Sequence, residues 1–175
     1  MPVMEHDTPC TAFTRTTRLA QGPLWQVAPL ALATAGALVF DDATGRVIDL
    51  DPRDWDGSPP APKRGRPRLG VTAREVTLLP RHWDWLAQQT GGTSAALRRL
   101  IDEARRADGG RTARRQAHEA AYRVMTALGG DLPGYEDATR ALFAGDLSLL
   151  AERLSAWPED LRTHVCALAT PREDP

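Results

Sequence analysis

The chain has 175 residues and a mass of 19.1 kDa, with 42% hydrophobic and 26% charged residues, which suits one medium-sized or two small globular domains. This composition excludes collagen-like and wholly disordered chains. The formal net charge of -1 hides an uneven distribution. Residues 63–115 hold 13 basic and 5 acidic side chains, residues 1–62 hold 4 and 8, and residues 116–175 hold 5 and 10. The basic middle indicates where a polyanion would bind.

Cysteine spacing and hydropathy bear on location and on metal binding. Cys10 and Cys166 lie near opposite ends of the chain, with no CxxC pair and no Cys/His spacing of the zinc type. We therefore expect a reducing, cytoplasmic location. The apolar stretch 27–40 begins deep in the chain, contains Pro29 and is too short to span a bilayer. We expect neither a signal peptide nor a membrane partner.

The N-terminal region, residues 1–51, is predicted to be a small β-α-β-β unit. Residues 11–20 fit a short strand or hairpin arm, and apolar residues at helical spacing follow over 24–32. Two apolar runs, 37–40 and 47–50, then flank a polar turn that contains glycine, a pattern typical of a hairpin. Such a unit is too small for a secure core and should pack on another part of the chain.

A linker and a strand-helix-helix unit are predicted next. Residues 52–69 are rich in proline and arginine and hold few side chains that could be buried, which indicates an extended tether. Within residues 70–107, a strand at 74–79 is followed by helices at 81–90 and 94–106. Apolar residues of the second helix follow helical spacing, while arginines occupy its other faces.

The C-terminal region, residues 108–170, is predicted to be a helical bundle, and residues 171–175 a disordered tail. Apolar residues repeat at helical spacing in four stretches, at about 112–128, 135–144, 146–156 and 159–169. Asp146 and Glu159 stand near helix starts, where a carboxylate meets unpaired N–H groups. Together the elements predict an α+β protein.

The linker carries a basic motif, Lys63-Arg64-Gly65-Arg66-Pro67-Arg68. Its glycine allows the backbone to approach a groove floor, its proline holds the chain extended, and its arginines suit an electronegative minor groove. The motif resembles an AT-hook, which implies DNA contacts by Lys63, Arg64, Arg66 and Arg68. A solvated basic tether is the alternative interpretation.

Residues 74–106 resemble the ribbon-helix-helix DNA-binding fold. The likeness rests on a strand closed by Pro80, a helix ended by Gly91-Gly92, and the opening of the second helix, Thr93-Ser94-Ala95-Ala96-Leu97-Arg98-Arg99-Leu100-Ile101. In that family, strands of two chains pair into a ribbon that enters the major groove, and the start of the second helix anchors a phosphate. The resemblance implies a homodimer. The DNA contacts expected are Thr93, Ser94, Arg98 and Arg99 of the second helix, with Arg74 or Thr77 of the strand according to its register.

The sequence leaves two possible registers for the strand at 74–79, which differ in the residues that they bury. The family's register buries the odd-numbered residues from Glu75 to Leu79 and turns the even-numbered ones to DNA. The other register buries Val76 and Leu78 and presents Glu75, whose carboxylate repels phosphate. The alternative to a ribbon is a strand and helix hairpin packed into the body of the protein.

The first helix of this unit carries two tryptophans. Trp83 is expected to pack in the core with Leu86, whereas Trp85 is expected to be exposed. Indole rings exposed in a basic region can stack on nucleobases.

Five segments spread over the chain carry a wider likeness. They are Val39-Phe40-Asp41-Asp42-Ala43-Thr44-Gly45-Arg46, Gly65-Arg66-Pro67-Arg68-Leu69-Gly70-Val71, Arg74-Glu75-Val76-Thr77-Leu78-Leu79-Pro80-Arg81-His82-Trp83, Ser94-Ala95-Ala96-Leu97-Arg98-Arg99-Leu100 and Ala141-Leu142-Phe143-Ala144-Gly145-Asp146. In these segments the chain resembles a bacterial family of uncharacterised proteins, domain of unknown function 2239. This resemblance implies no activity, so function has to be argued from the residues.

Enzymatic and metal-binding interpretations find little support. The acidic residues over 41–56 lack the spacing of an EF-hand loop and are expected to be solvated. His82 stands at a helix start without a visible partner, and Cys166 falls at an apolar helical position typical of a small core thiol. We expect no catalytic residue, no metal and no cofactor.

Two hypotheses follow. The first is a homodimeric DNA-binding transcriptional regulator, in which residues 70–107 dock on the duplex and residues 63–68 add groove and phosphate contacts. The second is a non-enzymatic adaptor module, in which the basic middle pairs with the acidic flanks. Any small-molecule effector stays unknown.

Overall fold

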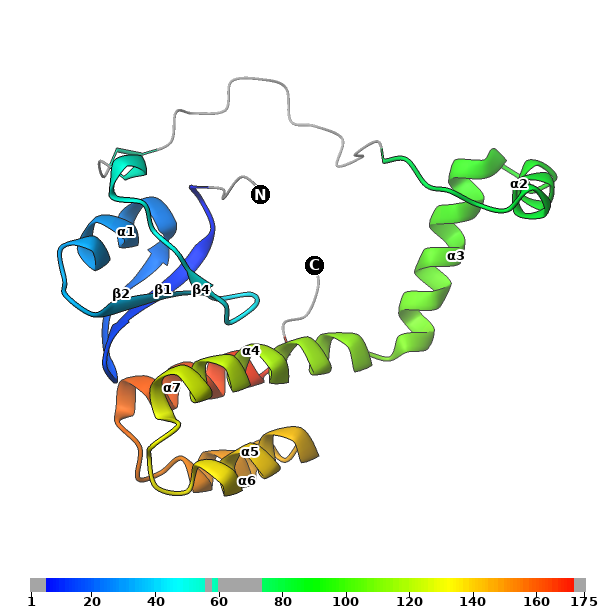
Figure 1. Cartoon of the computed structure of the whole chain (residues 1–175). Helices are drawn as coiled ribbons and strands as arrows, with labels where there is room; N and C mark the ends of the chain where they lie inside the picture. The colour runs from blue at the N-terminus through cyan, green and yellow to red at the C-terminus, as the bar shows by residue number, and fades with distance from the viewer. Residues whose placement is uncertain (1–5, 56–57, 60–73, 172–175) are drawn as a thin grey trace. The chain divides into compact units, whose positions relative to one another are not determined.

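The computed structural model describes residues 6–55, 58–59 and 74–171, which form two compact units (Figure 1). The sheet unit combines the described residues up to 59 with residues 112–171. The two-helix unit comprises residues 74–111. Residues 6–51 and 112–170, which the sequence assigned to separate regions, therefore meet in one compact unit.

The sheet unit begins with a β-hairpin. β1 (Pro9–Thr14) and β2 (Thr17–Pro23) pair antiparallel across a tight turn in which Arg15 has a φ of 52°. The stretch 11–20, expected as a short strand or hairpin arm, is thus divided between the two strands of a hairpin. The N-terminal part consequently has four strands around its helix, one more than the expected β-α-β-β order.

A helix and a second hairpin complete the sheet. α1 (Leu24–Leu32) is followed by β3 (Ala37–Asp41) and β4 (Val47–Ile48), and the four antiparallel strands lie in the order β2-β1-β3-β4. The predictions of a helix over 24–32 and of a hairpin after it are confirmed. A short 3-10 helix, η1 (Pro52–Asp54), follows the sheet.

The two faces of the sheet pack against different helices. Because side chains alternate along a strand, Cys10 and Ala12 of β1 point to one face and Phe13 to the other. The first face packs with Val39 of β3 against buried apolar residues of α1. The second face packs Phe13 and Phe40 into a larger core formed with the C-terminal helices. The sheet is therefore the middle of three layers.

Four helices make the C-terminal part of the sheet unit. They are α4 (Arg111–Gly129), α5 (Tyr135–Ala144), α6 (Leu147–Arg153) and α7 (Glu159–Ala169). These bounds confirm the predicted α+β class and the four predicted helices. Asp146 caps α6 by accepting a hydrogen bond from the Leu149 N–H at 2.9 Å. No helix in the described part of the chain is long and apolar enough to cross a membrane.

The turn between β3 and β4 is fixed to α4. Asp41 Oδ1 accepts hydrogen bonds from the N–H groups of Ala43 and Thr44 at 2.7 and 2.8 Å, which closes the turn. Arg123 of α4 then donates from Nη1 to the Thr44 carbonyl oxygen at 2.6 Å. Gly45 has a φ of 65° and lies against the Ala120 main chain, where a β-carbon would collide. The first segment of the family likeness, residues 39–46, thus contains a docked structural turn.

The two-helix unit contains α2 (Pro80–Ala87) and α3 (Gly92–Asp108). Pro80 occupies the first turn of α2, where its missing N–H costs nothing, and Gly91 precedes α3 with a φ of 85°. α2 lies beside the first turns of α3 (Figure 1). Both helices were predicted, with ends that differ from the structure by one to three residues.

The strand expected at 74–79 is absent from the single chain. Residues 74–79 carry no strand, and no described segment of the two-helix unit offers an edge with which they could pair. A strand needs such a partner for its main-chain groups. The expectation that Trp83 lies in a core is also wrong. Trp83 is 40% exposed, and Leu86 is the buried residue of α2.

Candidate nucleic-acid interface

The two-helix unit has almost no core of its own. Among residues 74–111, only Leu86 and Ala96 are buried. A folded unit of this size needs far more buried apolar area to offset the conformational entropy that folding removes. The unit therefore needs a further surface to cover it when it is folded.

Part of the apolar surface of the unit is left uncovered. α2 has 8 residues and lies beside the first turns of α3, which has 17. Leu100 and Ile101 in the second half are 40% and 56% exposed. With residues before and within α2, the exposed large apolar side chains of the unit are Val76, Leu79, Trp83, Trp85, Leu100 and Ile101. We call these six residues the apolar set.

The arginines of α3 are exposed to solvent. Arg98 and Arg99 are exposed, and no ion pair involves either of them among the residues that the structure describes. Arg106 is exposed as well and donates from Nε to the carbonyl oxygen of Asp102, one turn earlier on the same helix. Since the described carboxylates leave the Arg98 and Arg99 guanidinium groups uncommitted, they are able to contact phosphate.

The other predicted contact residues divide into three groups. Thr93 and Ser94 lie in the first turn of α3, Thr93 half-buried and Ser94 exposed. Arg74 and Thr77 are exposed in the segment without a strand. The four residues of the AT-hook-like motif, Lys63, Arg64, Arg66 and Arg68, lie outside the described residues. The described part of the unit thus brings together Thr93, Ser94, Arg98 and Arg99 on one helix.

The two compact units carry opposite net charges. Residues 62–111 carry 11 basic and 5 acidic side chains, a net charge of +6. Residues 1–61 and 112–175 together carry 11 basic and 18 acidic side chains, a net charge of -7. One compact unit is therefore cationic and the other anionic, which the total of -1 conceals.

The sheet unit contains a buried polar cluster that the sequence analysis did not predict. Asp42, expected to be solvated with the rest of the acidic run, is 6% exposed and accepts hydrogen bonds from the Thr11 hydroxyl at 2.7 Å and from Gln21 Nε2 at 3.4 Å. His164 of α7 is 3% exposed, and its Nε2 lies 4.0 Å from Asp42 Oδ1. Alternation along β1 and β3 places Thr11 and Asp42 on the face of the sheet that packs against the C-terminal helices. Nothing in the sequence, however, predicts that His164 lies beside them.

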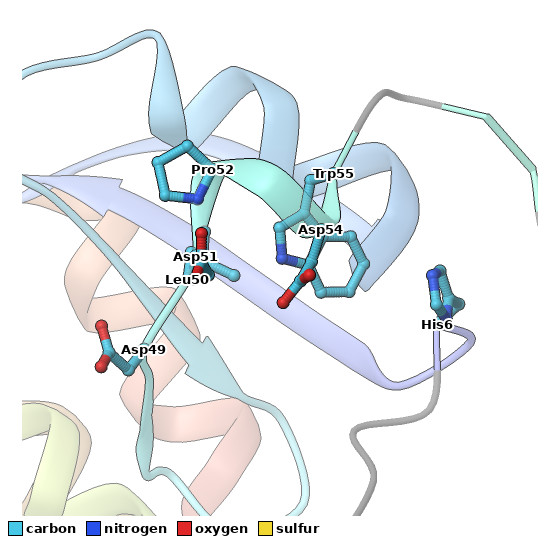
Figure 2. A pocket seen from close by; sticks show the side chains of 7 residues that line it. All are labelled: His6, Asp49, Leu50, Asp51, Pro52, Asp54 and Trp55. Carbon is cyan, nitrogen blue, oxygen red and sulfur yellow. The ribbon is translucent and has the colours of Figure 1, made fainter.

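Three other residues of the acidic run, Asp49, Asp51 and Asp54, line a shallow cavity of about 640 Å³ at the end of the sheet (Figure 2). His6 and Trp55 line it as well, with their rings 5.0 Å apart. The neighbouring Arg53 holds the pKa of Asp51 below its usual value through hydrogen bonds to the carboxylate. In the described part of the chain, no three His, Cys, Asp or Glu residues are arranged to hold a metal ion.

The thiols and the remaining histidines give no reactive centre. Burial, reinforced by the charges of Asp42 and Asp41, raises the pKa of Cys10 to about 12. Burial also raises the pKa of Cys166, which is half-buried. Such thiols are poor nucleophiles at neutral pH, because the thiolate is the reactive form. Burial, with the positive charge of Arg114, lowers the pKa of His118, and His82 is exposed.

Comparison with known proteins identifies a family for the chain. The chain matches the model of a family described as an uncharacterised protein conserved in bacteria over residues 9–169. No curated protein and no solved structure matches it. The matched range includes every element of both units, so the chain belongs to the bacterial family known as domain of unknown function 2239.

Proposed function

We propose that the protein is a homodimeric, DNA-binding transcriptional regulator, with the two-helix unit as its DNA-binding part. The observation that carries the proposal is the exposed cationic surface of α3, where Arg98 and Arg99 form no ion pair among the described residues. They belong to a unit of net charge +6. Cationic side chains of this kind supply most of the affinity for DNA phosphates, and Thr93 and Ser94 add hydrogen-bond donors nearby.

The second copy is supported by the apolar set. Five members of this set, all except Trp85, are large apolar side chains at least 40% exposed that we assign to the contact between copies, on a unit that buries only Leu86 and Ala96 among residues 74–111. Exposed apolar surface of this density marks a protein contact. A second copy is present wherever the chain is present, so it can cover the unit whenever the unit is folded. Pairing of two copies would also give the segment 74–79 the strand partner that one chain lacks.

A mobility-shift titration on random duplex DNA over a range of salt concentrations tests the proposal. The dissociation constant should rise steeply with salt, because bound cations release counterions from the phosphates. The double variant Arg98→Ala, Arg99→Ala removes four cations from the homodimer, so it should flatten the logarithmic salt slope by about 3.6. Its matched control, Arg140→Ala with Arg153→Ala in the sheet unit, removes the same charge and should leave the slope unchanged. A dissociation constant weaker than about 10⁻⁴ M would refute DNA binding.

The second candidate is a non-enzymatic protein-interaction module. The aliphatic members of the apolar set favour it, since Val76, Leu79 and Ile101 suit a protein surface better than a polyanion. This candidate predicts a monomer with no measurable affinity for DNA. Sedimentation equilibrium separates the two candidates, because the DNA-binding proposal requires twice the chain mass of 19.1 kDa.

A further inference from the structure

α2 presents its two tryptophans on different faces. Trp83 and Leu86 are spaced by three residues, so they lie toward one side of the helix, the side that packs on α3 through Leu86. Trp85 lies on another side, one turn after Arg81. Trp85 therefore lies on a different side of α2 from Trp83, which we assign to the contact between copies.

The indole of Trp85 is left without an aromatic neighbour. Its side chain is 49% exposed, and no ring contact involves it among the described residues. Arg81, spaced i to i+4 from it, is exposed as well. An exposed flat ring one helical turn from a guanidinium group, on a unit of charge +6, complements a ligand that carries both negative charge and flat rings.

We propose that Trp85 and Arg81 form a stacking site for an unpaired nucleobase of single-stranded DNA, with Arg81 on the adjacent phosphate. The inference rests on the proposed function and specifies its ligand further. In a duplex each base is stacked between its neighbours, so an indole at the surface finds a free ring only where the bases are unpaired. Base stacking on aromatic side chains is favourable and tolerates any sequence.

Three probes of equal length separate stacking from charge. They are a thymine-only single strand, a duplex, and an abasic deoxyribose-phosphate strand, which has the charge of the first probe without its bases. The full-length protein should show quenched tryptophan fluorescence with the thymine strand alone. Trp85→Phe should abolish most of this quenching and retain most of the affinity, because phenylalanine still stacks. Trp25→Phe, in α1 of the sheet unit, is the matched control and should leave the quenching intact.

Affinity provides the second measurement. Trp85→Ala should weaken binding of the thymine strand by roughly 5- to 150-fold and leave binding of the duplex and the abasic strand within about twofold. Circular dichroism of each variant reports whether the helices persist.

Four outcomes would overturn the inference. Equal affinity for the thymine and abasic strands would exclude stacking while leaving DNA binding intact. Equal weakening with all three probes would indicate a structural role for Trp85, and loss of the dimer in Trp85→Ala would place this residue in the contact between copies. Absence of binding to any probe would remove the proposed function together with the stacking site.

Discussion

Asp42 at the end of β3 and His164 in the middle of α7 meet inside the sheet unit, with 4.0 Å between Asp42 Oδ1 and His164 Nε2. The same carboxylate accepts the hydroxyl hydrogen bond of Thr11 at 2.7 Å. A charged group is buried at little cost only when hydrogen bonds replace its water. The hydrogen bonds from Thr11 and Gln21 therefore hold the Asp42 carboxylate within the sheet, at the place where His164 of α7 packs against it.

Replacement of the Thr11 hydroxyl tests the contribution of this cluster. Thr11→Val keeps the shape of the side chain but removes a donor to the buried Asp42 carboxylate, so the free energy of unfolding should fall by about 1–3 kcal/mol. Thr17→Val in β2 is the matched control, because Thr17 is an exposed strand residue, and it should change stability by less than about 0.5 kcal/mol. Urea unfolding followed by circular dichroism measures both. Equal effects of the two substitutions would contradict a role for the buried bond.

Glycine substitutions test the docking of the turn between β3 and β4 on α4. Gly45 and Gly36 have φ angles of 65° and 71°, so alanine is strained at either position. Only at Gly45 would the added β-carbon strike the Ala120 main chain, whereas nothing lies within 4 Å of it at Gly36. Gly36→Ala should cost about 1 kcal/mol, and Gly45→Ala several times as much, because the turn must leave the helix. Thermal unfolding of the two variants gives the comparison, and similar midpoints would argue against the docked turn.

These contacts also show what a single sequence can and cannot reveal. The helices could be predicted because glycine and proline mark their ends and their apolar residues repeat at helical spacing, as for α5 between Gly134 and Gly145. Asp42 and Asp49 are chemically identical in sequence, yet one is buried and the other exposed. The difference arises because α7, more than a hundred residues later, covers one face of the sheet.

The candidate site could likewise be predicted only in part from the sequence. Its arginines could be assigned to the outer faces of a helix from spacing alone, and the structure places Arg98 and Arg99 in solvent. The single chain has neither Trp83 in a core nor a strand at 74–79, for one common reason. Each needs a partner surface, and the described part of the two-helix unit is too short to supply one.

The buried thiol of Cys10 predicts a stability loss at high pH. Its pKa is about 12 in the folded chain, against 9.0 for a free thiol, so the unfolded chain binds fewer protons between these values. The stability contribution is full below pH 9 and falls as the pH rises toward 12, by about 1.4 kcal/mol per pH unit. Unfolding free energies of the wild type and Cys10→Ala between pH 8 and about 10.5 should therefore converge. A constant difference between the two would show that the thiol is not protected.

Substitution of Ile101 tests whether the apolar set joins two copies of the chain. Ile101 is 56% exposed in the single chain, and burial of such a side chain against a second copy contributes about 1.5–3 kcal/mol. Ile101→Ser should therefore raise the dimer dissociation constant at least about tenfold. Val47→Ser, at a 51% exposed position of β4 in the sheet unit, is the matched control and should leave the dimer intact. Sedimentation velocity over a concentration series measures both. If Ile101→Ser left the dimer unaffected, the contact between copies would not involve this part of α3. A monomeric wild type would contradict the proposed dimer.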